Sequence, residues 1–500
     1  MSASIRPERI RTPWLQRHLP LLVLLFGCTL ALVLRLCLIP FQSNDYVYFL
    51  QKWYEALANG GGLQALQKPL PDCNYTLAYL SLLAPLAGAG VPALIGVKAV
   101  SITFDFLLAG AVAWLLRIET GVGRMGQLAG AMLTLFLPTV FFNSSMWGQC
   151  DSIYVAFCLL ALGALLKRKG FLACVLLGAG FAFKMQAVFF LPIFVLAALI
   201  DRRVRLWHFA MIPAMVWLSG LPAILMGAAW WLPFSMCAEQ LKSAGIALSH
   251  NCPNLPWLFS IDTADILHPA FLVLGFAILL FGAAVVLCTG RLSKRNLVLF
   301  AVWTVMTCVC FFPSMHDRYL YAGDLLLWVR ALDTRRRSDA LCALVESGIS
   351  LLSYMPMLGS PAPIPFSILA IFRLLCFAFL TMKLLKESAL IISRNYAKII
   401  ANRKEVDVMK MIRPVSDLRN HFADISKTVH ETDQPVFLTK NGYGDMVVLS
   451  MEAFENLQFE SEVYFKLQEA EREAELTNQR YSSKDVLKEM KAAIGGEKVV

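Results

Sequence analysis

Long apolar runs separated by short charged segments fill the first 386 residues of the chain. An apolar stretch of about 20 residues is long enough to cross a bilayer as a helix. The run at 170–200 is too long for one crossing and is interrupted near Lys184 and Gln186, so we expect two short helices there. The segment 75–91 fits a re-entrant helix, an interfacial helix or a further span. The pattern predicts about twelve spans, in the runs 19–39, 95–116, 128–146, 151–166, 170–200, 207–231, 267–289, 297–313, 319–330, 341–358 and 366–386.

The pattern changes near residue 387, where apolar runs give way to charged residues. Residues 387–408 are predicted to form a charged helical linker, and residues 409–500 contain no spanning run. Apolar and turn positions in this last part predict a small α+β domain. Its expected elements are a strand at 410–415, a helix capped by Ser416, strands at 436–439 and 446–449, and a charged final helix. The predicted fold is therefore a polytopic α-helical membrane protein over residues 1–386 with a small C-terminal α+β domain.

Composition and charge support this division. The chain is 58% hydrophobic with a mean hydropathy of +0.60, which excludes an ordinary soluble protein over most of its length. The net charge of +10 lies largely in clusters between apolar runs, as the positive-inside rule describes. If 75–116 makes one net crossing, both termini are cytoplasmic in the cell membrane. The cytoplasmic clusters are then Arg6/Arg9/Arg11/Arg17, Arg117/Arg124, Lys167–Lys169, Arg202–Arg205, Arg291–Arg295 and Arg335–Arg337. The thirteen cysteines show no zinc spacing.

The loops on the opposite, external side carry two notable acids. Asp45 directly follows the first apolar run, at the membrane edge, where a carboxylate can stay ionised and face a cavity. Asp151 ends the motif Trp147-Gly148-Gln149-Cys150-Asp151 between two runs. Each acid has a plainer alternative role, which is to cap the N-terminus of a helix.

Candidate cations accompany these acids. Lys184 interrupts an apolar run, so it either lines a cavity or extends to the membrane surface. His316 and Arg318 lie at another external edge, where the planar guanidinium suits phosphate oxygens. The alternative for Arg318 is a simple ion pair with Asp317. Together these groups suit a site where an acid deprotonates a hydroxyl while cations stabilise a departing lipid phosphate.

These residues carry a resemblance in their order along the chain. The order is Asp45, Asn74-Tyr75, the WGQCDSIY motif at 147–154, Lys184-x-Gln186 with Pro192, and Met315-His316-x-Arg318-Tyr319. It resembles the GT-C superfamily of membrane glycosyltransferases over residues 15–385, in particular the GPI-mannosyltransferase-like branch and its bacterial relatives. One residue departs from that pattern: between His316 and Arg318 this chain has Asp317, where the family often has Glu.

The resemblance implies transfer of a sugar from a polyprenyl-phosphate donor on the external face. Asp45 would be the catalytic base and Asp151 a second acid for the acceptor or for a divalent cation, whose presence the sequence leaves open. Donor-phosphate ligands would be Lys184, Gln186, His316, Arg318 and Tyr319. The substrate cavity would be lined by Asn74, Tyr75, Trp147 and Gln149.

The C-terminal segment carries a second resemblance. IRPVSDLRNHFADI at 412–425 and PVFLTKNGYGDMVVLSMEAFENL at 435–457 are similar to the Phd/YefM antitoxin family, over 409–495. This implies a homodimer that binds operator DNA and a charged tail that folds on a cognate toxin. Each basic or amide group could instead be solvated surface. The candidate DNA contacts are Arg413, Arg419, Asn420, Lys440 and Asn441.

Two other functions fit parts of the sequence. The chain could act only as an antitoxin, with a non-catalytic membrane appendage. It could also be a transporter, because broken helices and charges among the spans suit substrate passage. The chain shows no internal repeat, and its polar motifs gather on one side, which favours the glycosyltransferase.

Overall fold

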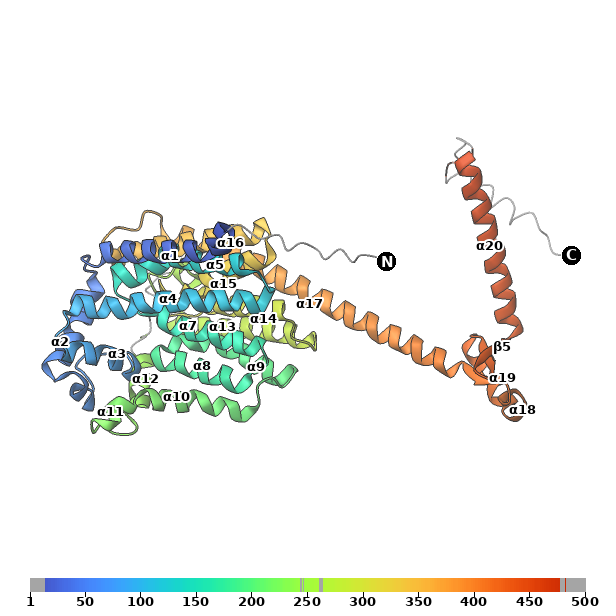
Figure 1. The fold of residues 1–500 in the computed structure, drawn as a ribbon, viewed down its shortest axis with the longest axis horizontal. Coiled ribbons are helices and arrows are strands. Elements are labelled where there is room, and N and C mark those ends of the chain that lie inside the picture. The colour runs from blue at the N-terminus through green and yellow to red at the C-terminus, as the bar shows by residue number, and fades with distance from the viewer. Residues whose placement is uncertain (1–13, 243–244, 246, 260–263, 477–481, 483–500) are drawn as a thin grey trace, which may run out of the picture. The chain divides into compact units, whose positions relative to one another are not determined.

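The computed structural model describes residues 14–242, 245, 247–259, 264–476 and 482. The chain forms two compact units, Met1–Ser393 and Arg394–Val500 (Figure 1). The first unit is almost entirely helical, and its helices α4, α7, α8 and α10 run side by side. A two-stranded parallel ladder, β1 (Ser249–His250) with β2 (Met315–His316), joins two of its loops.

The first unit contains helices of very different lengths. The α-helices are α1 Trp14–Leu38, α2 Gln51–Asn59, α3 Leu77–Gly88, α4 Ala93–Thr120, α5 Arg124–Phe136, α6 Pro138–Phe141, α7 Asp151–Leu166, α8 Gly170–Phe183, α9 Leu191–Ile200, α10 Met211–Ser219, α11 Leu221–Leu225, α12 Leu232–Lys242, α13 Ala264–Cys288, α14 Lys294–Phe311, α15 Tyr321–Thr334, α16 Arg337–Tyr354 and α17 Phe366–Lys410. Two π-helices, η1 Tyr46–Leu50 and η3 Phe142–Trp147, and 3-10 helices at Gly62–Gln67, Met185–Phe190, Leu206–Ala210, Leu255–Leu258 and Met355–Leu358 complete it.

Among the described residues, six helices are long and apolar enough to cross a membrane. A seventh candidate is the pair α5 and α6–η3, which is bent by 51° where Pro138 interrupts the backbone hydrogen bonding. The expected count of about twelve is not shown, because several predicted spans form helices of 16 residues or fewer, such as α7, α8 and α15. The break predicted within 170–200 is confirmed, since Lys184 has an extended backbone.

Burial separates central from peripheral helices. In α14, 89% of the most apolar window is buried, whereas in α1 only 17% is. A helix that is apolar on all sides and buried belongs in the centre of a bundle, and one with an exposed apolar surface faces a nonpolar surrounding or a partner. The sequence pattern alone did not separate these two classes.

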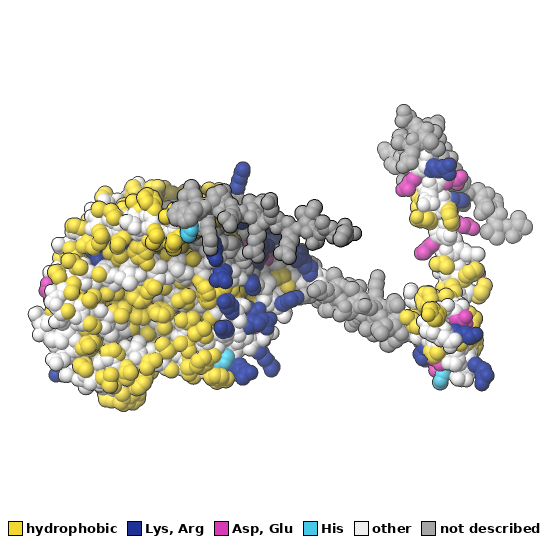
Figure 2. Space-filling view, in the orientation of Figure 1, with side chains coloured by type: hydrophobic (Ala, Val, Ile, Leu, Met, Phe, Trp, Pro, Cys, Tyr) yellow, Lys and Arg dark blue, Asp and Glu magenta, His cyan; other side chains and the backbone are white. Residues whose placement is uncertain are grey.

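The turns at the two ends of the bundle differ in charge. Helix α7 begins at Asp151 and ends one residue before Lys167, which separates the two residues by roughly 24 Å. Helix α8 runs back and ends before Lys184, so Lys184 returns to the end that holds Asp151. Figure 2 shows Lys and Arg side chains gathered at one end of this unit. Basic clusters and candidate site residues therefore occupy opposite ends.

The second unit has a three-stranded sheet. Its elements are β3 Ile412–Pro414, α18 Asp417–Asn420, α19 Phe422–Thr432, β4 Val436–Lys440, β5 Tyr443–Val448 and α20 Met451–Leu476. Strand β4 is central, parallel to β3 and antiparallel to β5. Its small core consists of Met411, Ile425, Val429, Val436 and Leu438.

Three details of this unit differ from the sequence prediction. Lys410 ends helix α17 and is not part of a strand. Ser416 makes no capping hydrogen bond through its side chain, and the predicted single helix divides at His421, whose backbone leaves the helical region. Most of the charged tail beyond Leu476, and the N-terminal arginines Arg6, Arg9 and Arg11, lie outside the described residues.

Candidate functional site

Asp45 lies between α1 and the π-helix η1. Its side chain is hydrogen-bonded by residues of a different loop, the one that follows η3. Its Oδ2 accepts hydrogen bonds from Trp147 Nε1 and Gln149 Nε2, both at 2.8 Å. The side chain makes no capping hydrogen bond. Instead, Ser43 Oγ accepts from the Tyr46 N–H at 3.1 Å. The helix-cap alternative for Asp45 is therefore wrong, and one carboxylate oxygen is oriented by a fixed indole and amide.

The turn that carries Trp147 and Gln149 depends on a glycine. Gly148 has φ +83°, a left-handed conformation that L-residues other than Gly, Asn and Asp rarely adopt. The turn follows η3, and the Gln149 N–H closes it onto the Asn143 carbonyl at 2.9 Å. π-Helical segments are frequent at functional sites because the extra residue re-aims the side chains. Here both η1 and η3 border the same cluster of polar residues.

Asp151 is almost fully buried and has several partners. Its Oδ1 lies 2.7 Å from Lys184 Nζ, and its Oδ2 accepts from Asn143 Nδ2 at 2.9 Å. Arg318 Nε lies 3.6 Å from the same Oδ2, close enough for an ion pair but not a hydrogen bond. Asp151 is the first residue of α7, and the N-cap position belongs to Cys150, so the cap alternative is wrong for this acid too.

Gln149 connects the two acids. Its Nε2 donates to Asp45, and its Oε1 accepts from the Tyr75 hydroxyl at 2.6 Å and from Lys184 Nζ at 3.4 Å. All of its hydrogen-bonding groups therefore point into one network. Arg318 closes this network from the other side, because its guanidinium lies over the Trp147 ring at 5.2 Å from the centroid.

The segment 316–318 provides one cation, not two. Burial lowers the pKa of His316 to about 2, assisted by the nearby charge of Arg318, so its imidazole is neutral. Its ring stacks on His250 with centroids 4.4 Å apart. Burial raises the pKa of Asp317 to about 8 against the opposing attraction of Arg318, whose charge is shared with Asp151. Arg318 Nη1 lies 3.6 Å from Asp317 Oδ1, within ion-pair distance, so the predicted alternative pair forms when this carboxyl is ionised.

Some predicted residues lie outside this network. The Asn74 side chain is exposed, and its backbone carbonyl accepts a hydrogen bond from Gln240 Nε2 at 3.2 Å. Gln186 lies beside the Tyr319 hydroxyl and makes no hydrogen bond to Asp151 within the described residues. Sequence reasoning missed Asn143 and His250. Asn143 was detectable as a polar residue four positions before Trp147 at the end of an apolar run, whereas nothing in the sequence marked His250.

The site does not offer a ligand set for a divalent cation. Both oxygens of Asp151 are occupied by Lys184 and Asn143, and two cations lie beside it. Among the described residues, no group of three or more His, Cys, Asp or Glu side chains is placed to hold a metal ion. The arrangement suits instead an anionic ligand near Lys184 and Arg318, with Asp45 on the far side of Gln149.

In the second unit the candidate DNA contacts are all exposed. Strand pairing brings several of them together: Pro414 pairs with Thr439, so Arg413 and Lys440 lie near the same end of the sheet. Asn441 and Gly442 form the β4–β5 turn with positive φ, as the Asn-Gly sequence predicts. Arg419 and Asn420 lie on α18, which directly follows β3.

Comparison with known families identifies this second unit. Residues 410–481 match the Phd/YefM antitoxin family of type II toxin–antitoxin systems. The match leaves the first 409 residues unassigned. A search of curated proteins finds no match for the chain. The second resemblance stated from the sequence is therefore confirmed, and the chain contains a Phd/YefM antitoxin domain with a toxin as the partner that this family implies.

Proposed function

We propose that the chain, which carries a Phd/YefM antitoxin domain at residues 410–481, is also a membrane glycosyltransferase in its first unit. The enzyme transfers a hexose, mannose-like, from a polyprenyl-phosphate donor to an acceptor on the external face. The observation that supports this most is the single network from Asp45 through Gln149 to Lys184 and Arg318. It combines an oriented carboxylate with two cations beside a buried acid, drawn from segments more than 100 residues apart.

The chemistry follows from the positions of these groups. Asp45 Oδ1 accepts no hydrogen bond from the described residues, so it is available to take the proton of an acceptor hydroxyl. The acceptor oxygen then forms the new glycosidic bond at C1 of the sugar as the bond from C1 to the phosphate oxygen breaks. Polyprenyl phosphate leaves with an additional negative charge, which Lys184 and Arg318 stabilise.

Several further residues support this reaction without taking part in the proton transfer. Trp147 and Gln149 hold Asp45 Oδ2 and fix the direction of Oδ1. Asp151 keeps Lys184 and Arg318 beside each other, although two free cations would repel. Neutral His316 and Tyr319 are donors at the edge of the site. A divalent cation, which the sequence left open, has no step in this reaction.

The membrane placement belongs to the same proposal. We place the basic end of the bundle, with Arg117, Lys167 and Arg335–Arg337, in the cytoplasm and the Asp45 end outside. About twelve crossings are then needed, in which short helices such as α7 and α8 count as spans. The antitoxin domain follows the last span and is therefore cytoplasmic, where a toxin and operator DNA are accessible. It would bind DNA as a homodimer through Arg413, Arg419, Asn420, Lys440 and Asn441.

Transfer of labelled sugar in isolated membranes tests the first unit. Membranes that contain the full chain should move label from a polyprenyl-phosphate hexose to an acceptor, and omission of the donor should abolish the signal. Substrate flux into sealed vesicles without a donor lipid would instead support the transporter. If the membranes show no sugar transfer and the vesicles no flux while DNA binding is intact, antitoxin function would remain as the sole activity.

A further inference from the structure

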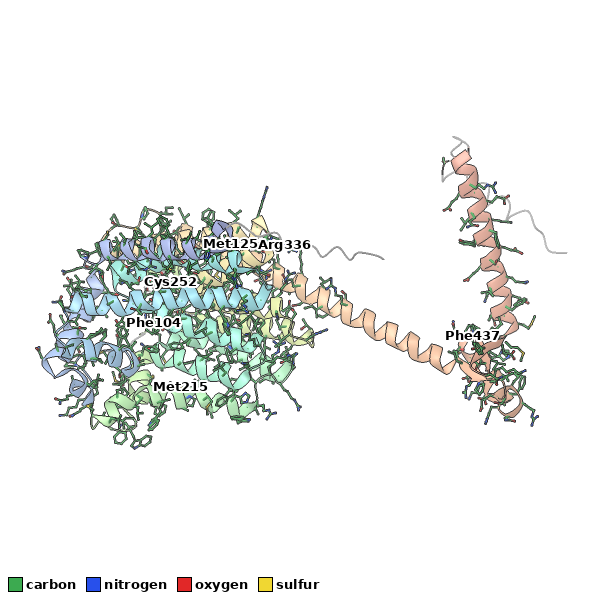
Figure 3. All side chains as sticks on the ribbon, viewed as in Figure 1. Phe104, Met125, Met215, Cys252, Arg336 and Phe437 are labelled. Carbon is green, nitrogen blue, oxygen red and sulfur yellow. The ribbon has the colours of Figure 1, made fainter. Side chains whose placement is uncertain are left out.

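A cavity lies at the end of the first unit opposite Asp45. It encloses about 340 Å³ between the ends of α4, α5, α15 and α16. Its floor is apolar, and three consecutive arginines form its rim. The lining residues are Leu116, Val122, Gly126, Ala331, Leu332, Ala340, Arg335, Arg336 and Arg337. Figure 3 labels Arg336 at this end of the unit, close to Met125, the neighbour of the lining residue Gly126.

The charges of these arginines are not compensated. Arg335, Arg336 and Arg337 are exposed and take part in no ion pair within the described part of the chain. A neighbouring cavity of about 380 Å³ is different, because two of its three cations, Lys294 and Lys167, are already engaged. There Lys294 Nζ donates to the Ile118 carbonyl at 2.8 Å, and Lys167 lies over the Trp114 ring. The arginine rim is therefore the place where an added anion gains most.

The backbone holds the three arginines together. Helix α15 ends at Thr334 and α16 begins at Arg337, so only two residues connect the helices. Arg335 has φ +54°, a conformation uncommon for a residue other than glycine. Such conformations cost free energy and persist where the surrounding structure requires them. This connection keeps three like charges on one short turn, although they repel one another.

The position of the cavity along the candidate membrane spans indicates what kind of ligand it binds. Leu116 and Ala340 lie within α4 and α16, close to the ends of the segments Ala93–Glu119 and Arg337–Leu358 that are long and apolar enough to span a membrane. At the end of a span, the acyl chains of the lipid meet its headgroups. A ligand at this depth meets apolar side chains below and guanidinium groups above.

We propose that this cavity binds an anionic phospholipid. The phosphate contacts the guanidinium groups of Arg335–Arg337, whose planar donor forks fit phosphoryl oxygens, and the start of an acyl chain covers the apolar floor. A phospholipid with net negative charge is preferred over a zwitterionic one, because the rim contributes three positive charges and no acid. This site is separate from the donor-phosphate groups Lys184 and Arg318, which occupy the other end of α7 and α8.

Native mass spectrometry of the purified full chain in detergent tests the assignment. The probes are phosphatidylglycerol, phosphatidylcholine and inorganic phosphate. The wild type should retain phosphatidylglycerol in preference to phosphatidylcholine. The triple variant R335Q/R336Q/R337Q should lose roughly a hundredfold in affinity, about fivefold for each charge. The matched control R202Q/R205Q/R291Q removes the same charge from exposed arginines outside the cavity and should bind as the wild type does.

A second variant separates a built site from general charge attraction. Ala340→Phe keeps all three arginines and fills the cavity, so it should lose phosphatidylglycerol as the triple variant does. Binding that survives Ala340→Phe, or that falls equally in the control triple, would show attraction to surface charge alone and overturn the site. Full displacement of phosphatidylglycerol by inorganic phosphate at equal concentration would also overturn it, because the apolar floor would then contribute nothing.

Discussion

Lys184 Nζ lies 2.7 Å from Asp151 Oδ1, although the two residues are 33 positions apart and each follows or begins a different helix. Both side chains are almost fully buried. The extended backbone of Lys184 between α8 and the 3-10 helix Met185–Phe190 turns its side chain toward the start of α7. This pair joins the loops at one end of the first unit, because Asn143, Gln149 and Arg318 all contact it.

Removal of one member of this pair should destabilise the first unit. Lys184→Met leaves Asp151 buried with weaker compensation, at an expected loss of about 3 kcal/mol in the free energy of unfolding. The double variant K184M/D151N removes both charges and should recover a large part of that loss. Thermal unfolding of the two variants in detergent measures the difference. Equal losses in the single and double variants would contradict the pair as described.

Replacement of Gly148 by alanine should destabilise the first unit for conformational reasons alone. A Cβ at this position meets Leu50 Cδ1 at 3.5 Å and Val97 Cγ1 at 3.6 Å, which are ordinary contacts. The cost of Gly148→Ala is therefore that of the left-handed backbone, about 1 kcal/mol. Because the turn orients Trp147 and Gln149 toward Asp45, activity should fall together with the unfolding temperature. Gly110→Ala is the matched control, since Gly110 lies within α4 and has open space around it. It should leave the activity unchanged and should not lower the unfolding temperature, because alanine is the better helix former.

The sequence predicted which residues form the site better than it predicted their hydrogen bonds and charge states. Asp45, Trp147, Gln149, Asp151, Lys184 and Arg318 were all selected from polar residues at the ends of apolar runs, and the structure brings them together. The role of Gln149 as a bridge depends on the direction of an amide, which no periodicity reveals. The neutral state of His316 depends on burial beneath His250, from a loop more than 60 residues earlier.

The fold was predictable where local patterns decide it. The β4–β5 turn at Asn441-Gly442 and the break at Lys184 follow from local chemistry. The helix division at His421 does not, because it depends on how α18 and α19 pack on the sheet. The number of membrane spans could not be determined from the sequence pattern, because an apolar run of 16 residues fits a short helix inside a bundle as well as a membrane crossing.

Asp317 should make stability depend on pH. Burial raises the pKa of this carboxyl from 3.8 to about 8 in the folded chain. Between about pH 4 and pH 8 the unfolded chain therefore binds fewer protons than the folded chain, and the stability contributed by this group falls as pH rises. Asp317→Asn removes the term and keeps an acceptor for the Arg318 N–H.

The comparison of wild type and Asp317→Asn isolates this carboxyl from His316, whose lowered pKa acts in the opposite direction below about pH 6.5. The stability of the variant relative to the wild type should increase from pH 5 to pH 8, as measured by thermal unfolding at each pH. A constant difference across this range would show that Asp317 is ionised throughout.

The antitoxin domain should bind DNA with a salt dependence that reports its phosphate contacts. Lys440 is exposed at the end of β4 near Arg413. Lys440→Gln should lower the slope of log affinity against log salt by about 1 if Lys440 contacts one phosphate. Lys427, which pairs with Glu431 on α19, provides the control Lys427→Gln with an unchanged slope. Identical slopes in both variants would remove Lys440 from the interface.

The most direct measurement is sugar transfer from a labelled polyprenyl-phosphate hexose in membranes that contain wild type, Asp45→Asn or Asp72→Asn. Asn keeps the size of Asp45 and its acceptor oxygen for Trp147 but cannot take a proton. Asp72 is an exposed acid of the same loop region and serves as the control. We expect wild-type transfer for Asp72→Asn and a loss of roughly a hundredfold or more for Asp45→Asn. Equal transfer in all three proteins would contradict Asp45 as the base.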